Sequence, residues 1–96
     1  MNKLILNDIP LDLNTFSHNM SIRNDVVTNT IYASIAVPLR KTMIGLEISY
    51  IAIVNSLNET IYELTNLNAI LSSINVTIKN EVIETNLSIT NIWHLS

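Results

Sequence analysis

The chain has no cysteine and only one glycine among its 96 residues. Without cysteine, it can form no disulfide, no thiolate zinc site and no cysteine nucleophile. With Gly45 alone, it can contain neither a P-loop nor a dinucleotide-binding fingerprint, because both need several glycines at fixed spacing. Charged residues are also scarce, at 14% of the chain against the roughly 25% of an ordinary soluble domain. These absences exclude several classes of enzyme and cofactor-binding protein.

Positively charged residues are few and scattered along the chain. Of the five lysine and arginine residues, only Arg40 and Lys41 are adjacent, and the net charge is −3. Nucleic-acid binding requires clustered cations that displace counterions from phosphates. A basic amphipathic helix suited to an anionic membrane surface is missing too. We therefore expect neither a nucleic-acid partner nor a membrane partner.

Apolar residues are plentiful but occur in short runs. They make up 48% of the chain, and the longest stretch, 44–54, is too short to cross a bilayer as a helix. The apolar run after Lys3 is too short for a signal peptide, so we expect no secretion by that route. Ninety-six residues suit a single domain, 1–96. With so few charged residues, Asn, Ser and Thr must cover much of the surface. Two explanations of this composition stay open: AT-rich codon use, or a protein partner that covers part of the surface.

The hydrophobic pattern predicts an α+β fold. Alternating apolar and polar residues indicate strands at Lys3–Leu6, 11–13, 20–27, 31–37, 44–54, 76–78 and 83–93. Residues 57–74 differ, because apolar side chains recur there every three or four positions, and Ser56 with Glu59 fits a capping box. We predict one amphipathic helix over 57–74, packed on residues 44–50 of a mostly antiparallel sheet of about five to six strands.

Three apolar residues are candidate interface positions. In the strand predicted at 44–54, one face is wholly apolar, whereas the other is polar at Glu47 and apolar at Ile51 and Ile53. A sheet face that is dry over part of its length must be covered there, and we favour a protein partner as the cover. Trp93 either continues the inward face of the last strand into the core or stands exposed as an interface aromatic.

The residues able to do chemistry are few and far apart, and they are Asp8, Asp12, His18, Asp25, Glu59, Glu63 and His94. The spacing of the first four matches no metal-binding loop, and carboxylates in turns explain them better. The two glutamates near the start of the predicted helix are explained by the helix dipole. We therefore predict no catalytic residue, no metal site and no cofactor.

The chain opens with a short strand, a turn and a second strand, KLILNDIPLDL at residues 3–13. A long strand followed by an amphipathic helix is predicted for GLEISYIAIVNSLNETIYELTNLNAILSS at residues 45–73. In this pattern the chain resembles small structural subunits of tailed bacteriophages, of the tail or baseplate type. The resemblance implies a non-enzymatic virion protein that acts by packing against protein partners, including further copies of itself.

A second functional class stays open. Phage-encoded inhibitors that bind a host defence complex are also small and acidic, and such a protein would act in the host cytoplasm. This alternative predicts an acidic face that mimics nucleic acid, built from Glu47, Glu59, Glu63, Glu81 and Glu84. The target of such a mimic is released as ionic strength rises, whereas a packed apolar interface hardly responds to salt.

Overall fold

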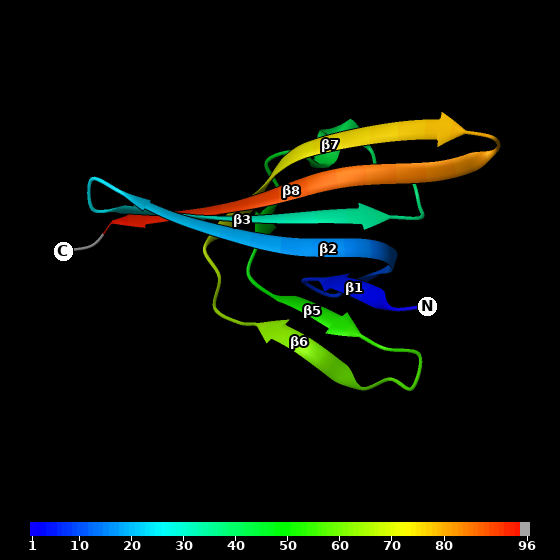
Figure 1. The fold of residues 1–96 in the computed structure, drawn as a ribbon, viewed down its shortest axis with the longest axis horizontal. Coiled ribbons are helices and arrows are strands. Elements are labelled where there is room, and N and C mark those ends of the chain that lie inside the picture. The colour runs from blue at the N-terminus through cyan, green and yellow to red at the C-terminus, as the bar shows by residue number, and fades with distance from the viewer. Residues whose placement is uncertain (95–96) are drawn as a thin grey trace.

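The computed structural model describes residues 1–94, which form one antiparallel sheet of eight strands (Figure 1). The strands are β1 (Lys3–Leu6), β2 (Ile9–Arg23), β3 (Val26–Ile35), β4 (Glu47–Ile48), β5 (Ile51–Val54), β6 (Thr60–Leu64), β7 (Ala69–Lys79) and β8 (Val82–His94). Their order across the sheet is β4-β7-β8-β3-β2-β1-β5-β6. The described residues include a short 3-10 turn, η1 (Lys41–Met43), but no α-helix, so the fold is all-β and the α+β prediction is wrong.

The segment predicted as a helix, residues 57–74, contains a turn, β6, a loop and the first half of β7. Asn58 and Asn66 interrupt it with φ angles of 60° and 55°, in the left-handed region that a right-handed helix cannot include. The capping box is absent as well. Instead, the side-chain oxygen of Asn55 accepts hydrogen bonds from the backbone N–H groups of Leu57 and Glu59, at 2.9 and 3.0 Å, and closes the turn between β5 and β6.

A β-bulge explains the helix-like spacing in the rest of that segment. Leu71 pairs with Ile89 and Ser73 with Ser88, so Ser72 is an extra residue on β7. The extra residue shifts the strand by one position and places Leu71 and Ile74 on the same face. Both side chains are buried, at 0% and 5% exposure. A spacing of three therefore arises here inside a strand.

Asparagine takes the place of glycine in the hairpin turns. In the β2–β3 turn, Asn24 and Asp25 have φ angles of 51° and 62°, and in the β7–β8 turn Asn80 and Glu81 have 52° and 64°. Two-residue turns with two left-handed residues match the twist of antiparallel strands, and asparagine adopts this conformation more readily than most residues do. This is how a sheet with long hairpins is built from a chain with a single glycine.

The long strand predicted at 44–54 is broken at Ser49 and Tyr50. Asn7, in the β1–β2 turn, holds the break: its side-chain oxygen accepts a 2.9 Å bond from the Ser49 N–H, and its side-chain amide donates a 3.0 Å bond to the Glu47 carbonyl. Because two residues lie outside the ladder here, Ile48 on one side of the break and Ile51 on the other both face the core. The prediction of one continuous strand over 44–54 with a single apolar inward face is therefore wrong.

The core lies where the sheet folds back on itself. Its β1–β5–β6 end approaches the β2–β3–β8–β7 end, and the rings of Phe16 and Tyr62 meet edge to face with centroids 5.0 Å apart. We call the side that carries the core the inner face of the sheet and the other side its outer face. The buried apolar side chains come from both ends and include Leu4, Leu6, Leu11, Leu13, Ile31, Ile35, Ile48, Ile51, Ile53, Leu71, Ile74, Leu87 and Ile89.

Candidate interaction surface

Three strands extend past the core as an arm. Figure 1 shows the end of the β2–β3 hairpin and the end of β8 running side by side away from β1, β5 and β6. In total, the molecule measures 47 × 29 × 20 Å. β7 begins at Ala69, which pairs with Asn91, so the last residues of β8 pair with β3 alone. We define the distal arm as residues 20–23 of β2, 26–29 of β3 and 91–94 of β8.

The inner face of the distal arm carries apolar side chains that the core does not reach. Ile22, Val27 and Trp93 form one row across the three strands. Ile22 is 65% exposed and Trp93 is 37% exposed, whereas Val27 on the middle strand is only 2% exposed. Met20, in the neighbouring row, is 56% exposed. The face that buries the core thus continues past it as an open apolar patch, which is the usual mark of an interaction site.

His18, just before the distal arm on β2, connects the start of the arm to β6. Its Nε2 lies 3.0 Å from the Asn29 side-chain oxygen, and its Nδ1 lies 3.2 Å from the Tyr62 hydroxyl on β6. Both bonds are satisfied when Nε2 donates to Asn29 and Nδ1 accepts from Tyr62. Partial burial raises the pKa of Tyr62 above its usual value, so its hydroxyl keeps the proton for this bond. These contacts fix the start of the arm in place against β6.

Beyond its base, the arm has an open backbone edge on β2. Residues 15–23 of β2 pair with β3 on one side, but β1 pairs only with the earlier part of β2, up to Asp12. No other strand among the described residues pairs with β2. Every second residue of an edge strand points its N–H and C=O groups outward, where another strand can bind them. The arm therefore ends in an unpaired strand edge.

The usual protection against strand addition is missing from this edge. Proteins protect exposed edges with lysine, proline or inward-pointing charges, and residues 13–22 contain no charged residue and no proline. The edge strand β6 is only five residues long and carries Glu63 and a bulge at Ile61. The outer edge of β7 has η1 beside it and ends at Lys79. Residues 69–71 of β7 are bonded to β4 or to residues 45–46, so its open uncharged edge covers only 72–78 and is shorter than that of β2 at 14–22.

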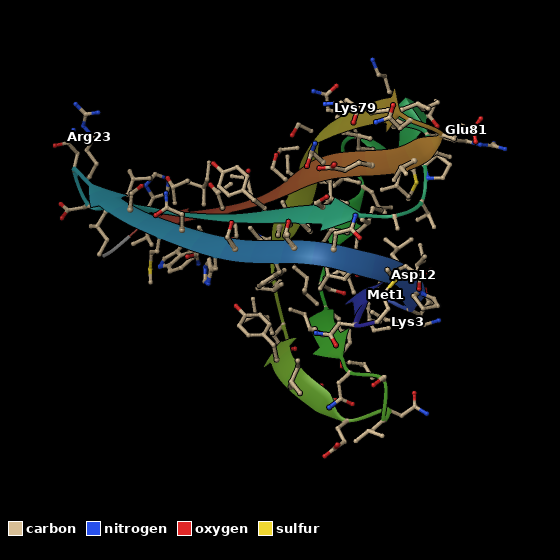
Figure 2. The ribbon with its side chains drawn as sticks, turned by 45° about the vertical axis from the view of Figure 1, so that its right-hand side comes forward. Met1, Lys3, Asp12, Arg23, Lys79 and Glu81 are labelled. Carbon is tan, nitrogen blue, oxygen red and sulfur yellow. The ribbon has the colours of Figure 1, made fainter. Side chains whose placement is uncertain are left out.

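Charges lie mostly away from the distal arm. Figure 2 places Arg23 at the tip of the arm, far from Lys79 and Glu81 at the other hairpin and from Lys3 and Asp12 near β1. The predicted acidic face is not assembled on one element. Its five glutamates lie on β4, on the β5–β6 turn, on β6, on the β7–β8 turn and on β8.

The predicted interface residues occupy different environments. Ile51 and Ile53 lie inside the core of the chain, at 0% and 6% exposure, beside Leu4 and Leu6 of β1. Other side chains of the same chain therefore cover Ile51 and Ile53. Trp93 continues the inward face of β8, which was the first of the two alternatives for this residue. It nevertheless lies beyond the core and remains partly exposed.

Met20 and Ile22 were missed as candidate surface residues. They lie on the strand predicted at 20–27, whereas no strand was predicted for residues 15–19, which the structure includes in β2. Their alternation with Ser21 and Arg23 indicated a strand, but it did not show that the core ends before these residues.

The described residues contain no group of three or more histidine, cysteine, aspartate or glutamate side chains placed to hold a metal ion. No helix among residues 1–94 has the length and apolarity needed to span a membrane. Comparisons with protein-family models, with curated proteins and with solved structures found no match to this chain. The geometry of the arm is thus the feature from which a function can be argued.

Proposed function

We propose that the protein is a non-enzymatic assembly subunit that binds other protein chains through its distal arm. The observation that carries this proposal is the exposure of Met20, Ile22 and Trp93 on the face that elsewhere forms the core. Aromatic and apolar side chains of this kind supply most of the binding energy at protein interfaces. The phage-subunit resemblance suggests a tail or baseplate as the assembly. The inhibitor alternative has less support, because Glu47 and Glu63 of its acidic face lie on β4 and β6, the strands at opposite ends of the strand order.

A capture experiment tests this function. Tagged wild-type chain, incubated with lysate of cells that contain the natural assembly, should retain a protein partner in 1 M salt, because apolar contacts are not screened. Ile22→Asp should reduce the captured partner by roughly tenfold or more, since it places a charge in the apolar patch. Quantitative mass spectrometry of the eluate measures both effects.

Ile78→Asp is the matched control. Ile78 is also an exposed apolar strand residue, at 72% exposure, but it lies on β7 next to the opposite hairpin. This variant should capture as much partner as the wild type. Equal capture by all three proteins would contradict a role for the arm. Release of the partner at high salt would instead favour the inhibitor alternative.

A further inference from the structure

From the open edge of β2, we infer that the first partner of the distal arm is a second copy of the same chain. In this inference, which rests on the proposed function, residues 19–23 of β2 pair antiparallel with residues 19–23 of the other copy. A two-fold axis then passes through Ser21, and the two three-stranded arms become one continuous sheet. Such a contact is isologous, because each copy offers the same segment.

The length of the pairing follows from the contacts at the base of the arm. Phe16 packs against Tyr62, and His18 is hydrogen-bonded to the same tyrosine, so β6 lies beside this part of β2. The segment that begins at Asn19 is beyond these contacts and ends at Arg23, before the turn. A two-fold axis at Ser21 is the arrangement that pairs all five of these residues with one another.

Side-chain matching favours a second copy over an unrelated strand. In this register Met20 lies opposite Ile22 of the second copy on the inner face, so two side chains that are 56% and 65% exposed cover each other twice. On the outer face Ser21 meets Ser21 of the second copy, and Asn19 meets Arg23. Apolar thus faces apolar and polar faces polar at every position.

The charge pattern also fits self-pairing. Arg23 is the one charged residue in the segment, and a two-fold axis at Arg23 would place two guanidinium groups directly opposite each other. With the axis at Ser21, the two Arg23 residues stand four residues apart along the strands, or about 14 Å. This separation exceeds the Debye length of about 8 Å at physiological salt, so their repulsion is largely screened.

Sedimentation equilibrium over a range of concentrations tests the pairing. A five-residue contact is small, so wild-type chain should show a weak, concentration-dependent dimer. Ser21→Glu and Ser21→Lys each place two like charges face to face across the axis, and each should weaken the dimer by roughly tenfold or more. Ser21 is exposed on the outer face, so both variants should fold, which circular dichroism checks.

Mixing the two variants gives the sharpest result. An equimolar mixture of Ser21→Glu and Ser21→Lys should dimerise again, because only the mixed pair places opposite charges across the axis. The control Asn75→Glu adds the same charge to the exposed outer face of β7 and should dimerise like the wild type.

Three results would overturn the inference: monomeric wild type at every concentration, a Ser21→Glu dimer as strong as the wild-type one, or no recovery in the mixture. A monomer that still captures a partner through Ile22 would leave the proposed function standing. The arm would then accept a strand from another protein instead of a second copy.

Discussion

Deleting Ser88 is expected to abolish the native fold. Ser88 separates Leu87 from Ile89, which are 2% and 0% exposed, and its loss makes these two inward-facing residues consecutive. Because consecutive strand residues point to opposite faces, one half of β8 must then turn its side chains away from the core. Far-UV circular dichroism and urea unfolding should show loss of the cooperative transition.

The substitution Ser88→Ala is the matched control, because it keeps the residue count and thus the register. It removes the hydroxyl contacts to Ser72 and Ser73 and should lower the free energy of unfolding by only about 1 kcal/mol. A deletion variant that unfolds with the same transition as this control would contradict the assigned register.

The second large effect is expected at Ile51. Its side chain is 0% exposed, and truncation to alanine removes apolar contacts and leaves a cavity beside Leu4 and Leu6. Ile51→Ala should therefore lower the free energy of unfolding by about 2–5 kcal/mol. Urea denaturation of the purified chain at a single low concentration measures this directly.

For comparison, Ile61→Ala removes the same atoms from a bulge residue that is 56% exposed. It should change the free energy of unfolding by less than about 0.5 kcal/mol. If Ile51→Ala proved as mild as Ile61→Ala while weakening association of the chain, Ile51 would belong to an interface instead of the core.

Much of the strand content could be predicted from the sequence, since β1 and β8 lie close to the strands that alternation placed at Lys3–Leu6 and 83–93. The failures share a physical cause. At Asn14, at Ser72 and across the Ser49–Tyr50 break, one or two extra residues change which side chains face inward. A period of two then gives way locally to a spacing of three, which resembles the period of a helix.

The candidate surface was harder to predict than the fold. Whether an inward-facing residue is buried depends on how far the opposing half of the sheet extends, and this is a tertiary property. Ile31 and Ile22 show the difference, because both lie on the inner face of the β2–β3 hairpin, yet Ile31 is 3% exposed and Ile22 is 65% exposed. Alternation assigns both to one face and does not show which of them other parts of the chain cover.

Residue-resolved amide hydrogen exchange at low and high protein concentration tests most directly whether the arm is a docking surface. We expect the outward-pointing N–H groups of residues 19–23 to exchange quickly in dilute protein and to become protected as concentration rises. The outer edge of β7, at residues 75–79, should exchange at the same rate in both samples. Protection along β7 with unchanged exchange along residues 19–23 would contradict the central claim.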